Sequence, residues 1–160
     1  MGLMARIPSP TKIAPTDWLF NGRPFTSDDI GKAEGFVYRL THIPTGKFYI
    51  GKKFFWSIRK TKGKKRRVRT ESDWQDYLSS SQLVQNQASA EGADVFLREI
   101  VSIHITRGDT NFSEIKLQFI HNVLERNDTL NDAIGKYRRP PDRIVAGRRH
   151  SSSNSAVSHT

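Results

Sequence analysis

Residues 36–55, Phe-Val-Tyr-Arg-Leu-Thr-His-Ile-Pro-Thr-Gly-Lys-Phe-Tyr-Ile-Gly-Lys-Lys-Phe-Phe, carry the clearest structural pattern of the chain. Two runs of residues that favour β-strands, 36–42 and 47–55, flank Ile43-Pro44-Thr45-Gly46. Proline at the second position and glycine at the fourth suit a type I turn. The stretch therefore predicts a β-hairpin.

The register of this hairpin determines whether its two tyrosines meet. If Pro44-Thr45 alone forms the loop, Tyr38 faces Gly51, and Tyr49 lies diagonally from Tyr38 on the same face. If Gly46 instead forms a bulge, the parity changes and the two tyrosines separate. The sequence leaves both registers open.

Downstream, the sequence predicts a helix, a strand and a second helix. Ser72-Asp73-Trp74-Gln75 fits a capping box that opens a helix ending at Gly92. Residues 95–105 alternate as a third strand does, 107–110 indicate a turn, and 111–125 have the apolar stripe of a helix. The apolar residues that share one face are Val95, Leu97, Val101, Ile103 and Ile105 on the strand and Phe112, Ile115, Phe119, Ile120, Val123 and Leu124 on the helix.

This order of elements predicts an α+β domain over residues 34–135, with a small three-stranded antiparallel sheet flanked by helices. Residues 1–33 contain four prolines and no sustained apolar period, so we expect a flexible N-terminal arm whose aromatic residues can dock on the core. Residues 136–160 begin basic and end rich in serine, which is typical of a flexible tail.

Charge is concentrated inside the predicted domain. The chain of 160 residues has 26 Lys and Arg against 16 Asp and Glu, a formal net charge of +10. Ten of these cations and no acidic residue lie between positions 52 and 69: Lys52, Lys53, Arg59, Lys60, Lys62, Lys64, Lys65, Arg66, Arg67 and Arg69. Clustered cations release counterions from DNA or RNA, so we expect a phosphate-binding surface here. A solvated loop or a targeting signal is the alternative.

Composition also excludes several classes of site. The chain has no cysteine, which excludes disulfides, thiolate zinc sites, iron–sulfur clusters and cysteine nucleophiles and permits a reducing cytoplasm. No apolar run approaches 18 residues and no secretion signal is visible, so no membrane association is expected. His42, His104 and His121 lack metal-ligand spacing, and nothing indicates an obligate protein partner.

The hairpin residues also carry a family resemblance. Phe36-Val37-Tyr38, followed eleven positions after Tyr38 by Tyr49 within Tyr49-Ile50-Gly51, resembles the signature of the GIY-YIG nucleases. The second half matches literally, whereas the first half has Phe36 where glycine is usual and Val37 where isoleucine is usual.

Later positions agree with the family in order. Arg59 lies ten residues after Tyr49, where the family's essential arginine stands, and Glu114 opens a Glu-x-x-Leu pattern, where its metal-binding glutamate stands. Asn131 follows that helix at the place of a common terminal asparagine, and residues 73–81 are similar to a phage subgroup.

The resemblance implies a DNA endonuclease that uses Mg²⁺ or Mn²⁺ and acts as a free-standing homing or phage-encoded enzyme in the cytoplasm of an infected host. The catalytic residues it implies are Tyr38, Tyr49, Arg59 and Glu114, with Glu114 as the metal ligand and Asn131 beside the basic residues in DNA binding.

These residue types suit phosphodiester hydrolysis. A cation held by one carboxylate polarises the phosphate, and a hard ion such as magnesium keeps several waters. The guanidinium of Arg59 presents a planar fork to phosphate oxygens. A phenol has a pKa near 10, and we expect nearby cations to lower it, so that Tyr38 or Tyr49 accepts a proton from water.

Each residue also has a structural explanation. The tyrosines can be ordinary strand aromatics, Glu114 can stabilise a helix N-terminus, and Asn131 can occupy a turn. The basic insertion also allows Arg66, Arg67 or Arg69 to take the role given to Arg59.

The sequence is therefore compatible with three functions. The first is a metal-dependent endonuclease. The second is a non-catalytic nucleic-acid-binding module, for which the degenerate first half of the signature argues. The third, weaker one is a basic structural or packaging protein.

Overall fold

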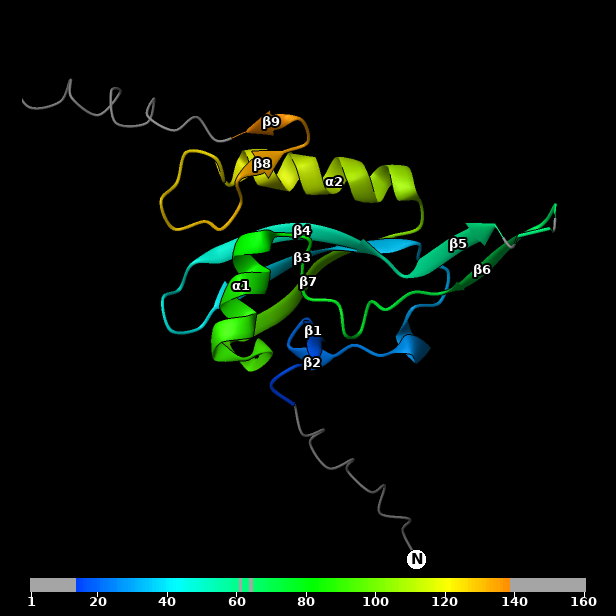
Figure 1. The fold of residues 1–160 in the computed structure, drawn as a ribbon, viewed down its shortest axis with the longest axis horizontal. Helices are drawn as coiled ribbons and strands as arrows, with labels where there is room; N and C mark the ends of the chain where they lie inside the picture. Colours follow the sequence, from blue (N-terminus) through cyan, green and yellow to red (C-terminus); the bar gives the residue numbers. More distant parts are fainter. Residues whose placement is uncertain (1–13, 61, 64, 139–160) are drawn as a thin grey trace, which may run out of the picture.

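The computed structural model describes residues 14–60, 62–63 and 65–138, which form an α+β fold around a five-stranded mixed sheet (Figure 1). The strand order is β2-β1-β7-β3-β4, and two further two-stranded sheets pair β5 with β6 and β8 with β9. The strands are β1 Trp18–Phe20, β2 Arg23–Pro24, β3 Gly35–His42, β4 Phe48–Phe54, β5 Trp56–Lys60, β6 Arg67–Glu71, β7 Phe96–His104, β8 Ala133–Ile134 and β9 Tyr137–Arg138. The helices are α1 Gln82–Glu91 and α2 Arg107–Ile120, with short 3₁₀ turns at Ser27–Asp29 and Ala93–Val95.

The sheet is larger than the three antiparallel strands that the sequence predicts. Residues 18–24, assigned to a flexible arm, form β1 and β2, and β1 runs parallel to β7. Trp18 anchors this segment, because its ring packs against Phe36 and Tyr38 and its Nε1 donates to the carbonyl of Trp74 at 3.0 Å. Residues 1–13 and 139–160 of the predicted arm and tail lie outside the described residues.

The β3–β4 hairpin is confirmed, in the first of the two predicted registers. Tyr38 pairs with Gly51, and the ladder runs from Thr41 opposite Phe48 to Gly35 opposite Phe54. The loop is longer than the Pro-Thr pair, because His42 N donates to Lys47 O at 2.7 Å and closes four residues. Gly46 has a φ of +71° within this loop, a backbone conformation that favours glycine.

The first helix begins later than the capping-box pattern predicts. Its N-cap is Ser81, and the hydroxyl of Ser72 instead donates to Phe54 O at 2.7 Å. Residues 73–80 instead form an irregular segment. Trp74 in this segment is fully buried against Phe55.

Each face of the sheet has its own core. One face packs aromatic rings from β1, β3 and the segment before α1, including Phe36, Tyr38 and Trp74, with Val84 of α1. On the other face, α2 and the residues after it cover β3 and β4, so that Val123 packs with Val37 and Ile50. Figure 1 shows α2 lying along this side of the sheet.

The predicted apolar stripe of the second helix is mostly exposed. α2 begins at Arg107, where a turn is predicted, because Thr106 caps it by accepting a hydrogen bond from Asp109 N at 3.0 Å. The helix faces the sheet with Thr110, Glu114 and Gln118, and with Leu117, which packs against the core. Phe112 is 66% exposed and Phe119 55%.

The five apolar residues predicted to share one face of the third strand do not share it, because the pairing with β3 shifts by one residue between Val37 and Tyr38. Ile103 therefore packs against the same core as Ile100. Phe96, Arg98 and Ile100 are buried, whereas Val101 is exposed. The buried guanidinium of Arg98 breaks the apolar pattern on that face, and α2 leaves the opposite side of β7 partly open.

Neither α1 nor α2, the helices of the described residues, has the length and apolar character needed to cross a bilayer. The β5–β6 ribbon, defined as Trp56–Lys60 and Arg67–Glu71, projects from the body of the molecule (Figure 1).

Candidate active site

The β3–β4 register brings the two signature tyrosines together. Tyr38 and Tyr49 share one face, and their ring centroids are 6.1 Å apart. A Cβ added at Gly51 would lie 2.6 Å from Cε1 of Tyr49 and 2.7 Å from the hydroxyl oxygen of Tyr38. Only glycine at position 51 leaves room for both rings.

Burial sets the ionisation of these phenols. Tyr38 is completely buried, and loss of hydration raises its pKa well above the ordinary 10.0, with the neighbouring phenols of Tyr49 and Tyr77 adding to the rise. Burial also raises the pKa of Tyr49, although hydrogen bonds from Ser80 and Ser79 oppose that rise. The expected lowering of these pKa values by cations is therefore wrong.

A pocket of about 410 Å³ lies beside edge strand β4. It collects residues from distant parts of the sequence, including Tyr49, Lys52, Ser80, Glu114, Gln118 and Asn131. Tyr49 and Lys52 point to opposite faces of β4, so the pocket wraps around the edge of the sheet.

Glu114 supplies a carboxylate to this pocket from α2. Its side chain is 13% exposed, and Lys52 Nζ donates to its Oε2. Glu114 is the eighth residue of α2, beyond the first turn where a carboxylate would interact with the helix dipole. Glu114 therefore does not stabilise the N-terminus of α2, and its carboxylate instead lines the pocket.

Asn131 holds the edge strand in place. Its Oδ1 accepts from Ile50 N at 2.9 Å and its Nδ2 donates to Ile50 O at 2.8 Å. Gln118 Nε2 also donates to Ile50 O, at 3.0 Å. These contacts satisfy the backbone between Tyr49 and Gly51, which fixes the strand that carries both.

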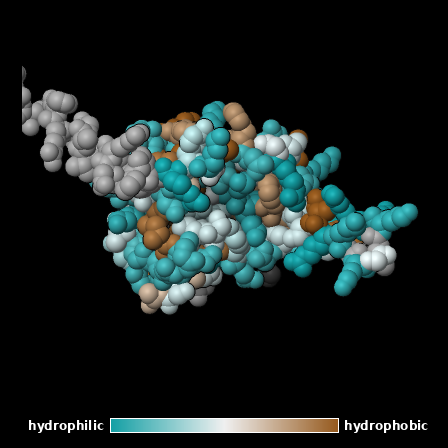
Figure 2. Space-filling view, turned by 45° about the horizontal axis from the view of Figure 1, so that its top comes forward, coloured by the Kyte–Doolittle hydropathy of each residue, from teal (hydrophilic) through white to brown (hydrophobic). Residues whose placement is uncertain are grey.

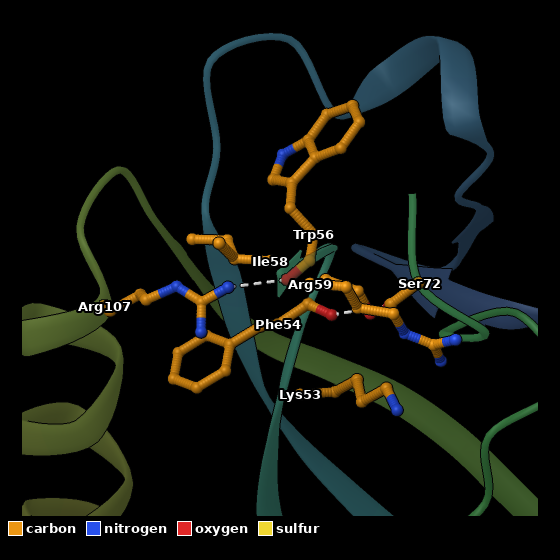
Figure 3. A pocket seen from close by; sticks show the side chains of 8 residues that line it. Lys53, Phe54, Trp56, Ile58, Arg59, Ser72 and Arg107 are labelled. Carbon is orange, nitrogen blue, oxygen red and sulfur yellow. Dashed lines mark hydrogen bonds between the residues drawn. The ribbon is translucent and has the colours of Figure 1, made fainter. Parts of the chain in front are cut away.

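Arg59 lies in a neighbouring pocket, not in that of Tyr49 and Glu114. This second pocket, of about 340 Å³, is lined by Lys53, Phe54, Trp56, Ser57, Ile58, Arg59, Ser72 and Arg107 (Figure 3). Figure 3 shows Arg59 and Lys53 extending to the same side.

Lys53 links Arg59 to the tyrosines. Lys53 Nζ donates to Asp73 Oδ1 at 2.7 Å and lies 3.8 Å from the ring centroid of Tyr77, which contacts Tyr38. The hydrogen bond from Lys53 and, to a smaller extent, the charge of Arg59 lower the pKa of Asp73. The structure thus brings Tyr49 and Glu114 to one pocket and places Tyr38 behind Tyr49 in the core, whereas Arg59 lines a separate cationic pocket with Lys53.

The remaining predicted DNA-binding cations lie mostly on the β5–β6 ribbon. Those on the ribbon or its connecting turn are exposed: Lys60, Lys62, Lys65, Arg66, Arg67 and Arg69. Lys64 lies outside the described residues. The described residues contain no cluster of three His, Asp or Glu side chains that could hold a metal ion, which leaves Glu114 as the single predicted ligand.

The sequence interpretation missed two features of the site. Ser79 and Ser80 hydrogen-bond the tyrosines, and the only signal for them was the similarity of residues 73–81 to a phage subgroup. Arg107 donates to Trp56 O at 2.6 Å and stacks 4.3 Å from the centroid of Phe54, and the turn predicted at 107–110 concealed it.

Comparison with known families agrees with this geometry. Residues 18–137 match a family model described as "Putative endonuclease segE, GIY-YIG domain". The match begins at Trp18, so it includes the β1–β2 segment. No curated protein and no solved structure matched the chain.

Proposed function

Because the chain belongs to the GIY-YIG endonuclease family, we propose that it is an active, metal-dependent endonuclease that hydrolyses phosphodiester bonds of DNA. The observation that supports this most is the shared pocket of Tyr49, Lys52, Glu114 and Asn131. These four polar residues come from β4, from α2 and from the segment after α2, and they meet at the edge of β4.

The two tyrosines take different roles in this proposal. Tyr49 lines the pocket, so its hydroxyl is the one that meets the scissile phosphate or the attacking water. Tyr38 is buried behind it and positions it. Since burial raises both pKa values, both phenols begin the reaction protonated, and Tyr49 first acts as a hydrogen-bond donor.

The donor set fits a hard divalent cation. Glu114 presents one carboxylate that already attracts the ammonium of Lys52, and magnesium is commonly held by one or two carboxylates, waters and substrate phosphate. Bound at Glu114, Mg²⁺ or Mn²⁺ would neutralise charge developing on the phosphate. Arg59 and Lys53 in the adjoining pocket would bind phosphate oxygens on the same strand of DNA.

The finer assignment is to a phage-encoded, homing-endonuclease-like enzyme acting in the cytoplasm of an infected cell. Its support is the similarity of residues 73–81 to a phage subgroup, together with the matching family description.

A non-catalytic nucleic-acid-binding module remains the second candidate, because Phe36 replaces a signature glycine. The structure gives Phe36 a packing role, since its ring lies 4.8 Å from that of Phe55 in the aromatic core. Gly35 is the glycine that the backbone requires here, because a Cβ would lie 2.9 Å from Lys53 O.

Supercoiled plasmid DNA distinguishes these two functions. We expect nicked or linear product with Mg²⁺ or Mn²⁺ and no product with EDTA. Salt-sensitive binding without cleavage under either metal would support the binding module, and cleavage that persists in EDTA would remove the metal-dependent mechanism.

A further inference from the structure

The β5–β6 ribbon has exposed faces and carries an unusual charge. From Ile58 onward along β5, and along all of β6, every residue is exposed, including Ile58 at 48% and Val68 at 46%. A two-stranded ribbon without a covered face is marginally stable in water. Within the described part of the chain, the ribbon contacts the body of the molecule near its base, through Trp56, Arg69 and Glu71.

Cations occupy both faces of the ribbon. Directly opposed residues share a face, so Lys60 with Arg67, and Ile58 with Arg69, lie on one side. Arg59, opposite Val68, lies on the other. Figure 2 shows the ribbon as a largely hydrophilic projection at the right of the molecule. Positive charge on both sides suits a site with phosphates on both sides.

The base of the ribbon is fixed to the segment before β3 and to the start of α2. Trp56 Nε1 donates to Ala33 O at 2.9 Å, and Arg69 pairs with Glu34. Figure 3 shows the third contact, in which Arg107 donates to Trp56 O at 2.6 Å. One residue, Phe55, separates β5 from β4, the strand of Tyr49. A nucleic acid held by the ribbon is thereby held beside the pocket.

The dimensions favour a groove of B-form DNA. Five strand residues span about 17 Å, and paired strands lie about 4.8 Å apart. The major groove of B-DNA is about 12 Å wide and admits a two-stranded β-ribbon. The major groove of A-form RNA is deep and too narrow for such readout.

We propose that the β5–β6 ribbon enters the major groove of duplex DNA, with its cations on both phosphate walls, and holds the duplex against the pocket at β4. The inference rests on the proposed nuclease function and adds the form of nucleic acid and the groove that the chain recognises.

The test is binding of the full-length chain to fluorescent 30-base-pair duplexes by anisotropy in EDTA, where no cleavage is expected. The first ribbon variant is Lys60→Gln with Arg67→Gln, on the two strands. The second, Lys65→Gln with Arg66→Gln, lies in the turn that joins them and is counted with the ribbon variants. The control, Lys32→Gln with Lys116→Gln, removes the same charge from exposed positions outside the ribbon. Circular dichroism verifies the fold of each variant.

We expect each ribbon variant to weaken DNA binding at least tenfold and to reduce the slope of log K against log salt by about 1.8, since two phosphate contacts are lost. The control should stay within twofold. The wild-type chain should prefer duplex DNA to duplex RNA or single-stranded DNA of the same sequence by at least tenfold. Methyl green, a major-groove ligand, should compete, whereas netropsin, a minor-groove ligand, should not.

Equal losses in ribbon and control variants would overturn the inference, as would equal affinity for duplex RNA or single strands, or competition by netropsin alone. Failure of the nuclease proposal is separate. Ribbon-dependent duplex binding without plasmid cleavage under Mg²⁺ or Mn²⁺ would remove the catalytic function and leave the ribbon inference intact. Cleavage that the ribbon variants leave unchanged would support the nuclease function and overturn the ribbon inference.

Discussion

Gly51 lies directly opposite Tyr38 in the β3–β4 ladder, and a Cβ at position 51 would come within 2.7 Å of the Tyr38 hydroxyl oxygen. The glycine of the signature is therefore explained by the rings on either side of it. Tyr38 fills the space that a side chain at position 51 would need, and Tyr49 closes the other side. The spacing between Tyr38, Tyr49 and Gly51 in the sequence thus determines how the two rings pack around the glycine.

Replacement of Gly51 by alanine should disturb both stability and activity. Overpacking of a filled site costs about 1–3 kcal/mol, and the displaced Tyr49 should lower the cleavage rate. Thermal unfolding and plasmid cleavage measure the two effects. Gly108→Ala is the matched control, because a Cβ there comes no closer than 3.9 Å to Thr106. Equal behaviour of the two variants would show that the tyrosines do not require Gly51.

Alkaline pH should destabilise the chain through Tyr38. Its pKa is raised in the folded state, so the unfolded state loses its proton first, and the stability that this group confers is complete below pH 10.0 and declines above it. The decline reaches about 1.4 kcal/mol per pH unit for one group. Tyr38→Phe should therefore show a shallower loss of unfolding free energy between pH 10 and 11.5. Tyr137→Phe, at an exposed position, should follow the wild-type curve, and a wild-type slope in Tyr38→Phe would refute this account.

Asn131→Ala should loosen the edge of the sheet. Both amide contacts with Ile50 would be lost and a buried backbone group left without its partner, at a cost of about 1–3 kcal/mol. Chemical denaturation measures this loss, with the exposed Asn111→Ala as control. If Asn131→Ala weakened DNA binding without changing stability, Asn131 would bind DNA directly, as the family resemblance implies.

Arg59 and Arg67 should differ in the step that they affect. Arg59 lines a pocket with Lys53, whose ammonium lies 3.8 Å from the ring centroid of Tyr77. Arg59→Gln should therefore slow cleavage at saturating DNA about 10- to 100-fold, the range expected for loss of a charged hydrogen bond. Arg67 is exposed on the ribbon, so Arg67→Gln should weaken binding and leave the saturated rate unchanged. Single-turnover kinetics over a range of DNA concentration separate the two effects. The reverse pattern would transfer the catalytic role from Arg59 to Arg67.

Local patterns predicted the centre of this fold well. The hairpin, the strand over 95–105 and the position of Glu114 on a helix all depend on residues close in sequence. The convergence of Tyr49 and Glu114 followed from the family resemblance, since no spacing rule joins residues 65 positions apart.

The errors arose where tertiary contacts outweigh local pattern. Ser72 fits a helix cap, but its hydroxyl binds Phe54 O and the helix starts after Ser81. Arg98 is buried beside Trp18, which concealed the inner face of β7. The polar Gln118 faces the sheet because it binds the backbone of β4, and this leaves Phe119 exposed. None of these contacts is encoded in a short sequence pattern.

The proposed catalytic centre depends most directly on Glu114. Neutralising a carboxylate that holds a catalytic cation forfeits several kcal/mol of transition-state stabilisation, and each 1.36 kcal/mol is a tenfold change in rate. Glu114→Gln should therefore lower the single-turnover rate of plasmid cleavage in Mg²⁺ by at least about 10²-fold, while duplex binding in EDTA stays within twofold. Glu125→Gln, at an exposed position after α2, should cleave at the wild-type rate. A Glu114→Gln chain that cleaves as fast as wild type would contradict the assignment of the pocket at β4 as the active site.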